Sequence, residues 1–257
     1  MTKLALIVTA LIAAAAGTAN FARAQANPNP ANAEVHILPV QGNIYMLVGA
    51  GGNITMQVGS DGILLVDTGL AAMSDKVLAA IRSISDKPIR YIINTHVHAD
   101  HTGGNEAIAK AGSTITGGNV VADIGASAGN QAMIIAFQTV LERMSAPTGQ
   151  QAPAPQGAWP TDTYTTRERK LYFNGEPIEI IHVPAAHTDG DSIVFFHKSD
   201  VVSTGDLFMT ERYPIVDLQR GGNIQGLIDG LNRIIALTTV EAMQEGGTLV
   251  IPGHGRL

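Results

Sequence analysis

The stretch His96-Val97-His98-Ala99-Asp100-His101 brings three imidazoles and one carboxylate together within six residues. It follows a β-type run, Tyr91 to Asn94, and leads toward two glycines, so we expect a turn at the end of a strand. Such a turn can direct several side chains toward one point. Because imidazole and carboxylate groups are ligands that zinc takes from proteins, the sequence predicts a metal centre at this strand end.

The composition limits the ligands and the partners of such a centre. The chain has 257 residues and no cysteine, so it can form neither a thiolate ligand nor a disulfide. The metal must therefore be held by nitrogen and oxygen atoms. The formal net charge of −6 repels phosphate backbones, which argues against a nucleic-acid partner.

The N-terminal residues have the pattern of a secretory signal. Lys3 supplies a positive charge, Leu4 to Ala16 is apolar, and Ala22-Arg23-Ala24 has the small-x-small pattern of a signal peptidase site. We expect residues 1–24 to be removed, and residues 25–257 to form one domain in the periplasm or outside the cell. The apolar stretch is too short to span a bilayer, and no later stretch is predicted to span one.

Short β-type runs, bounded by residues typical of turns, recur along the chain. We expect strands at Val35–Pro39, Ile44–Val48, Ile54–Val58, Ile63–Val66, Tyr91–Asn94, Ile178–Val183, Ile193–Phe196, Val201–Ser203 and Leu249–Ile251. The first four follow one another through short turns and therefore predict an antiparallel meander.

Apolar residues at helical spacing predict three helices, which span Val77 to Ile84, Met133 to Met144 and Ile224 to Ile235. Pro88 would stop the first helix, and Asn223 is placed to cap the third. The stretch from Ser145 to Thr161 is rich in Ala, Gln and Pro and predicts a surface loop. Two runs of strands, each followed by helices, favour two sheets packed face to face with helices on their outer faces.

The His-x-His-x-Asp-His turn and the residues after it resemble the metallo-β-lactamase superfamily, from about Val35 to the end of the chain. In that family a later His, an Asp that follows Gly and a last His that follows Gly join the turn, and these match His187, Asp206 and His254. Each of the three follows a predicted strand, so all can meet at one sheet edge. The resemblance implies an α+β fold, a four-layer αβ/βα sandwich of two mixed sheets with helices on the outer faces.

The resemblance also implies two metal ions in adjacent sites. Zinc is the expected metal, with manganese or iron as alternatives. The ligands it implies are, for the first metal, His96, His98 and His187; for the second, Asp100, His101 and His254; and, as the bridge between them, Asp206.

The activity implied by the resemblance is that of a dinuclear zinc hydrolase, in which a metal-bridging hydroxide attacks a carbonyl group. The expected small-molecule substrate is a β-lactam, lactone, ester or thioester. Asp100 is the expected catalytic residue, because it would orient the hydroxide and pass a proton to the leaving group. Two alternatives stay open: a mononuclear iron oxidoreductase resembling persulfide dioxygenases, and a periplasmic metal-binding accessory protein without turnover.

Other polar and aromatic residues are expected to act around the metals. Asp67, in Val66-Asp67-Thr68-Gly69, should orient a ligand histidine without binding metal itself. The remaining histidines, His36, His182 and His197, are expected to bind no metal. Candidate substrate contacts lie in the variable segments, at Trp159, Tyr164, Arg212 and Tyr213.

The last candidate ligand lies close to the end of the sequence. Only three residues follow His254, whereas relatives usually continue into a closing helix, so we expect the domain to lack that cover. Backbone near a chain end frays unless packing holds it, and we therefore expect the second metal to be bound more weakly than the first.

Overall fold

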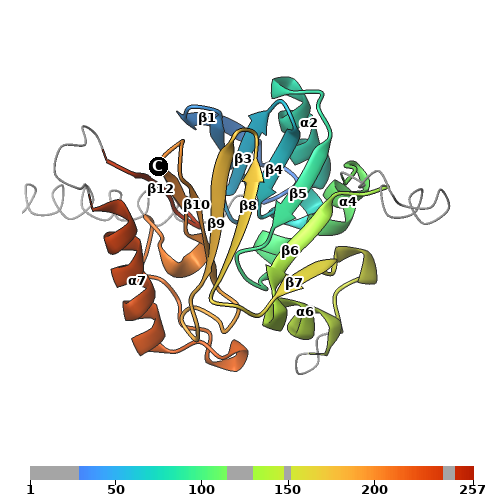
Figure 1. Cartoon of the computed structure of the whole chain (residues 1–257). Coiled ribbons are helices and arrows are strands. Elements are labelled where there is room, and N and C mark those ends of the chain that lie inside the picture. Colours follow the sequence, from blue (N-terminus) through green and yellow to red (C-terminus); the bar gives the residue numbers. More distant parts are fainter. Residues whose placement is uncertain (1–28, 115–129, 148–151, 240–246) are drawn as a thin grey trace, which may run out of the picture.

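The computed structural model describes residues 29–114, 130–147, 152–239 and 247–257 (Figure 1). The predicted signal, residues 1–24, lies outside these ranges. Within them the strands form two mixed sheets, and helices lie on the outer faces of the pair. The α+β sandwich predicted from the sequence is therefore confirmed.

The first sheet has seven strands in sequence order: β1 (His36–Gln41), β2 (Ile44–Val48), β3 (Ile54–Gly59), β4 (Gly62–Val66), β5 (Ile89–Ile93), β6 (Met133–Phe137) and β7 (Asp162–Tyr164). The first four strands pair antiparallel, which confirms the predicted meander. From β4 to β7 the pairing is parallel, so these strands all end at the same edge of the sheet.

The second sheet has five strands in the order β12 (Leu249–Ile251), β11 (Val201–Ser203), β10 (Ser192–Phe196), β9 (Glu176–His182) and β8 (Glu168–Phe173). Its pairs are antiparallel except β11 with β12, which run parallel. Strands β11 and β12 therefore also end at a common edge.

The alternation of side chains along β4 shows how the layers are held. Leu64 and Val66 are fully buried between the sheets, in a cluster with residues of the second sheet such as Phe196. Ile63 and Leu65 point the other way, into a cluster with helix residues. Because side chains of a strand alternate between its two faces, a strand that is apolar throughout is buried on both. Each such side chain contributes roughly 1.5–3 kcal/mol of hydrophobic free energy.

Helices cover the outer faces of both sheets. On the first sheet lie α2 (Ser74–Ile84) and α4 (Asn105–Lys110), and on the second lies α7 (Ile224–Thr238). The other helical elements are η1 (Ala71–Met73), α3 (Ala99–Thr102), α6 (Gln138–Ser145), η2 (Gln156–Ala158), η3 (Gly205–Leu207) and η4 (Leu218–Arg220). The predicted cap of α7 is confirmed, since the Asn223 side chain accepts a hydrogen bond from Gln225 N at 2.8 Å.

The prediction of one helix from Met133 to Met144 was wrong. Residues 133–137 form strand β6, which lies between β5 and β7, and only the residues from Gln138 onward are helical. A short apolar run that is buried on both faces of a sheet has no periodicity that separates it from a buried helix. Strands β7 and β8 were not predicted.

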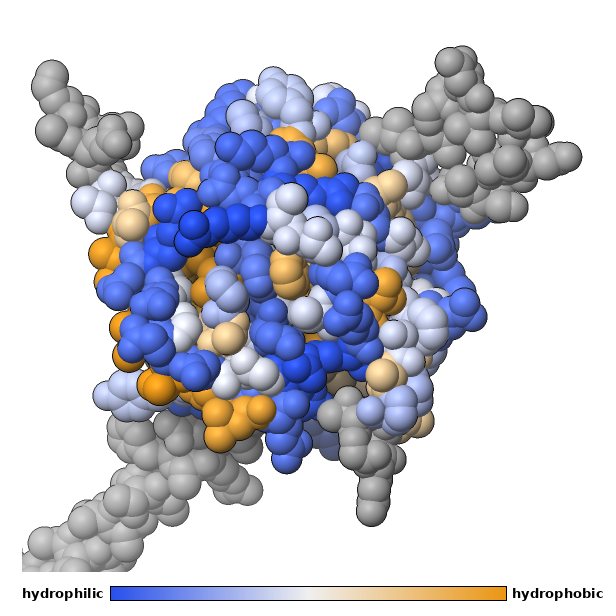
Figure 2. Space-filling view, turned by 60° about the horizontal axis from the view of Figure 1, so that its bottom comes forward, coloured by the Kyte–Doolittle hydropathy of each residue, from blue (hydrophilic) through white to orange (hydrophobic). Residues whose placement is uncertain are grey.

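Helix α7 buries one side and exposes the other. Leu227 and Ile234 pack on the second sheet, whereas Ile224, Ile228 and Ile235 are exposed. Figure 2 shows hydrophobic residues gathered along the left of the view, the side on which Figure 1 places α7. Among the described residues, no helix combines the length and the apolar character needed to cross a membrane.

Candidate metal centre

The turn after β5 brings the motif imidazoles together at the edge of the first sheet. Thr95 N donates a hydrogen bond to Asp67 Oδ1 at 2.8 Å, which fixes the backbone as it leaves the strand. The short helix α3 then turns the chain back. As a result the ring of His96 lies 4.9 Å from that of His98 and 4.3 Å from that of His101, measured between centroids.

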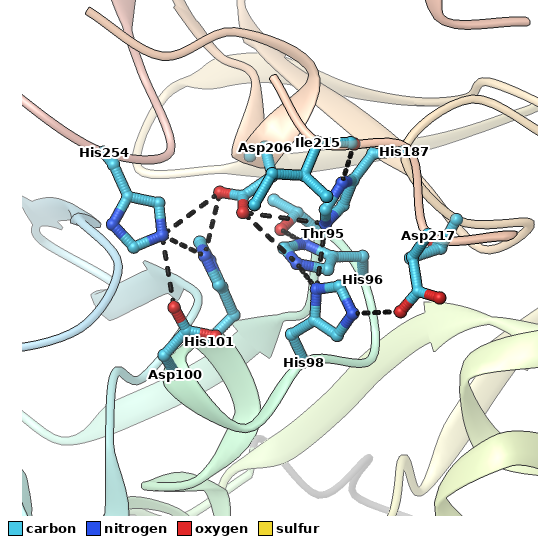
Figure 3. A network of polar contacts seen from close by, with 12 residues as sticks. Thr95, His96, His98, Asp100, His101, His187, Asp206, Ile215, Asp217 and His254 are labelled. Atoms are coloured by element: carbon cyan, nitrogen blue, oxygen red, sulfur yellow. Dashed lines mark hydrogen bonds and ion pairs between the residues drawn. The ribbon is translucent and has the colours of Figure 1, made fainter. Parts of the chain in front are cut away.

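The second sheet presents the other three candidate ligands opposite this turn. His187 lies in the loop between β9 and β10, Asp206 lies in η3 directly after β11, and His254 follows β12. Figure 3 shows these side chains and those of the turn pointing toward one another. The structure thus brings together every residue that the sequence predicted as a ligand, in two groups.

The first group consists of His96, His98, His187 and Asp206, whose ligand atoms all lie within 4.8 Å of one another. His98 Nδ1 is 3.1 Å from His96 Nε2 and 2.8 Å from His187 Nε2. Asp206 Oδ2 is 3.9 Å from His96 Nε2 and 3.6 Å from His187 Nε2. Three nitrogens and one oxygen are a donor set that zinc accepts.

The second group consists of Asp100, His101 and His254. His254 Nε2 is 3.2 Å from Asp100 Oδ2 and 3.3 Å from His101 Nε2. The other carboxylate oxygen of Asp206, Oδ1, is 3.0 Å from His101 Nε2 and 3.4 Å from His254 Nε2. One oxygen of Asp206 therefore faces each group.

Asp206 also provides the test of whether these residues fit a metal. Its Oδ1 atom is buried, and its contacts with the described residues lack hydrogen-bond geometry. A buried carboxylate oxygen without a donor is costly unless a cation lies beside it. Together with the nitrogen-rich neighbours, this oxygen fits a divalent metal ion.

Two glycines allow this close approach. A Cβ atom at Gly52 would collide with the imidazole ring of His101, and one at Gly253 would collide with Asp206 Oδ1. The backbone on both sides of the second group therefore has room only for glycine.

Asp67 acts on a ligand histidine, as the sequence predicted. Its Oδ2 atom lies 2.8 Å from His101 Nδ1 and accepts a hydrogen bond from Thr95 Oγ1 at 2.6 Å. Asp67 has a left-handed φ of 65°, and its carboxylate contacts Thr95 and His101 of the turn after β5. A carboxylate on the far nitrogen of an imidazole fixes the ring and leaves the near nitrogen available for metal.

One loop, residues 215–217, holds two histidines of the first group. Ile215 O accepts from His187 Nδ1 at 2.6 Å, and Asp217 Oδ2 lies 2.8 Å from His98 Nε2. Arg220 Nη1 donates to the same Asp217 oxygen at 2.7 Å. Asp217 was not predicted from the sequence, because no motif surrounds it and a single acidic residue in a loop is ordinarily solvated.

The charges in the centre favour ionised carboxylates. Burial opposes the charged form of Asp206, but nearby His101, His254 and His187 outweigh it and hold its pKa below the ordinary value. Burial also opposes a charge on His101, yet Asp206 and Asp67 raise the pKa of that imidazole. For His96, burial and the neighbouring imidazoles act together, and its pKa is lowered.

The turn that carries His254 is held by residues from earlier in the chain. Asn53 Nδ2 donates to Pro252 O and to Gly255 O, both at 3.0 Å, and Asn53 N donates to Gly253 O at 2.8 Å. Thr210 N donates to the carbonyl of His254 at 3.1 Å. The expectation of a loosely held end therefore loses its basis, because the described turn is tied on two sides.

The other residues singled out in the sequence take mainly structural places. Tyr164 is buried with its hydroxyl 2.7 Å from Ser192 Oγ, and Trp159 Nε1 donates to Ala154 O at 2.9 Å while its ring packs near α6. Arg212 and Tyr213 are exposed beside a separate groove. In the part of the chain that the structure describes, neither metal-type group includes the remaining histidines, His36, His182 and His197.

Comparison with known proteins identifies relatives by sequence. The family model described as the metallo-β-lactamase superfamily matches residues 39–254. The linear primary-alkylsulfatase of Pseudomonas sp. (strain ATCC 19151) is 27% identical over an alignment of 217 residues, and the match covers 76% of this chain and 40% of that protein. The chain thus spans less than half the length of that relative.

Solved structures share the fold. A metallo-β-lactamase from Pontibacter korlensis superposes with a TM-score of 0.60 and 14% identity, over 87% of this chain and 92% of that one. A double mutant of the sec-alkyl sulfatase PisA1 gives 0.58 and 16%, over 79% of this chain and 36% of that one. At these identities the likeness concerns the fold alone.

Proposed function

Because this chain belongs to the metallo-β-lactamase superfamily, we propose that it is a metal-dependent hydrolase, which binds two zinc ions and hydrolyses a small carbonyl substrate. The observation that carries the proposal is the position of Asp206 between two ligand groups, with one carboxylate oxygen toward each. A single tetrahedral zinc has no use for so many ligands.

The roles of the residues follow from their positions. The first metal would be held by His96, His98 and His187, the second by Asp100, His101 and His254, with Asp206 shared. When bound, two zinc ions supply an activated water near neutral pH and polarise the carbonyl under attack. The Asp100 side chain is 31% exposed, so its carboxylate faces the open side of the centre. From there it can take up a proton and deliver it to the leaving group.

Esters, thioesters, lactones and β-lactams are the carbonyl substrates that this chemistry suits. The imidazole and carboxylate donors suit zinc, with manganese or iron as alternatives, and the chain has no cysteine to add a thiolate. A second candidate is a sulfate ester, which the alkylsulfatase relative favours. A mononuclear iron oxidoreductase would bind metal at only one of the two ligand groups. If that were the first group, the buried Oδ1 of Asp206 would have no cation beside it.

Metal analysis and a substrate panel test the proposal together. The purified protein should contain two zinc ions per chain and turn over at least one ester, thioester, lactone or β-lactam reporter. Release of inorganic sulfate from an alkyl sulfate, with no carbonyl turnover, would support the second candidate. One iron per chain would refute the dinuclear site, and two zinc ions without turnover would support an accessory protein.

The matched variants are Asp206→Asn and Asp162→Asn. Asp206→Asn should lose most activity and at least one metal, because the shared negative oxygen is replaced by an amide. Asp162 of β7 in the first sheet pairs with Arg169 of β8 in the second and belongs to neither metal group, so Asp162→Asn should keep both metals. Full turnover with two metals in Asp206→Asn would contradict the shared role.

A further inference from the structure

A cleft of about 460 Å³ reaches the second ligand group at His254, which lines its wall. Its walls come from the segment before β1, the loop between β2 and β3, and the turn around His254, and they include Glu34, Asn53, Glu211 and His254.

His254 places the reacting end of this cleft. Its Nε2 atom is 3.2 Å from Asp100 and 3.4 Å from the buried, unpartnered Oδ1 of Asp206. That oxygen points to a cation beside it, so the bond under attack belongs at the inner end of the cleft. The rest of a substrate would then lie along the remaining wall residues, which include Glu34 and Glu211.

The outer walls of the cleft carry negative charge. Glu34 and Glu211 are both exposed along it, and among the described residues that line it there is no lysine or arginine. The internal segments that the structure does not describe, residues 115–129, 148–151 and 240–246, contain no lysine or arginine. A group in the outer cleft therefore meets carboxylates.

The lysine and arginine residues nearest in the chain are not among the residues that line the cleft; Arg256, which follows Gly255 of its wall, is exposed but does not line it. Lys76 donates to three carbonyl oxygens of the segment before β1, at 2.7–3.0 Å. Arg220 pairs with Asp217 at 2.7 Å. Arg212, which follows Glu211, lines a second groove with Leu231 of α7, and this groove shares Glu211 with the cleft.

We propose that this cleft is a specificity pocket that selects substrates whose outer group is positively charged, such as an ammonium, over neutral and anionic ones. The proposal rests on the hydrolase function proposed above and names the substrate class of the same site. At a separation of about 6 Å in a partly exposed cleft, each carboxylate favours a cation by roughly three- to tenfold at low ionic strength. The same walls disfavour the carboxylate of a β-lactam and the sulfate of an alkyl sulfate.

An isosteric set of thioesters isolates the charge. Acetylthiocholine, its neutral isostere 3,3-dimethylbutyl thioacetate and the anionic S-acetyl-3-mercaptopropanoate release the same kind of thiol. Because the chain has no cysteine, a thiol reagent reads the product without background from the protein. The zinc-loaded enzyme should show a kcat/KM for acetylthiocholine about tenfold or more above that for the neutral isostere, and the anionic thioester should be slowest.

Charge-neutral variants assign the effect to the cleft. Glu34→Gln and Glu211→Gln should each lower the ratio of kcat/KM between cationic and neutral substrates by about three- to tenfold, and 0.5 M salt should reduce the wild-type ratio. The matched control is Glu142→Gln. Glu142 is exposed on α6, and the one described hydrogen bond of its side chain is accepted from Gln138. This control should keep the wild-type ratio.

Binding separates a failure of this inference from a failure of the proposed function. If no thioester is hydrolysed, the hydrolase proposal fails for this class, and calorimetry of choline against 3,3-dimethylbutanol on the zinc-loaded protein still measures the charge preference. Tighter binding of choline, lost in Glu211→Gln, supports the pocket. Equal or tighter binding of the neutral alcohol, or a cation preference unchanged in both variants, overturns it.

Discussion

Replacing Asn53 by alanine should weaken the second metal site without touching a ligand. The Asn53 side chain is buried, and its Nδ2 atom makes two 3.0 Å hydrogen bonds to carbonyls on either side of His254. The backbone bonds from Asn53 N to Gly253 O and from Thr210 N to His254 O stay in place in the variant. The loss is therefore confined to two side-chain hydrogen bonds.

The size of the effect follows from those two bonds. Each contributes about 1 kcal/mol, so holding the turn in its metal-binding shape would cost roughly 2 kcal/mol more. Since 1.4 kcal/mol corresponds to a factor of ten, the dissociation constant of the second zinc should rise about 30-fold. The first zinc should change by less than about threefold, because its ligands lie in other loops.

Zinc titration against a chromophoric chelator measures both constants, and hydrogen exchange should show reduced protection of Leu249 to Leu257. The matched control is Asn43→Ala, since Asn43 Nδ2 also donates to a backbone carbonyl, that of Val58 at 2.9 Å, but far from the centre. It should lower the free energy of unfolding and leave both zinc constants unchanged. If Asn53→Ala binds both metals as tightly as the wild type, the turn is held by its backbone contacts and the reasoning is refuted.

Four further outcomes can be measured. Asp217→Ala should weaken the first zinc about 10- to 100-fold by releasing His98, while Asp217→Asn, which keeps an acceptor oxygen, should restore part of the affinity; equal constants in all three proteins would exclude a positioning role. Burial raises the pKa of Asp191 from 3.8 to about 8, so the folded metal-free chain holds a proton there that the unfolded chain releases. Its free energy of unfolding should fall, by up to about 1.4 kcal/mol per pH unit, between about pH 4 and 8, and Asp191→Asn should remove that slope in urea titrations. Chelation of zinc held at 100 times its dissociation constant should remove about 2.7 kcal/mol per site and lower Tm by roughly 5–10 °C per site, so an unchanged Tm would mean that no metal is bound. Protein recovered from a cell envelope or medium fraction should begin at Gln25, and an intact Met1 on cytoplasmic protein would contradict the predicted signal.

The candidate ligands could be predicted because they lie in short motifs at strand ends. The His-x-His-x-Asp-His turn is local, and the chain direction alone places it at the edge where β4 to β7 end. His187, Asp206 and His254 each follow a strand of the second sheet, so the same reasoning applied to them. Asp67 was found because Val66-Asp67-Thr68-Gly69 matches a motif that recurs in the family, and it follows β4 directly.

The features that could not be predicted from the sequence depend on how distant segments pack together. Met133 to Phe137 could be recognised as a strand only by knowing that β5 and β7 lie on either side of it. Asp217 contacts His98, which lies 119 positions away in the sequence. Asn53 donates to the carbonyls of Pro252 and Gly255, which lie 199 and 202 positions away. No local pattern marks an Asn or Asp whose partner is brought to it by the fold.

The position of the centre between the two sheets explains why both kinds of residue are needed. The first group takes His96 and His98 from the first sheet and His187 and Asp206 from the second, and the second group likewise joins Asp100 and His101 to His254. Neither sheet alone presents a complete donor set. The ligands must therefore be held in register by contacts that cross the interface, as Asn53 of the first sheet does with the His254 turn of the second. A change in the packing of the sheets would alter the spacing of the two groups directly, whereas a change within one sheet would leave its own ligands together.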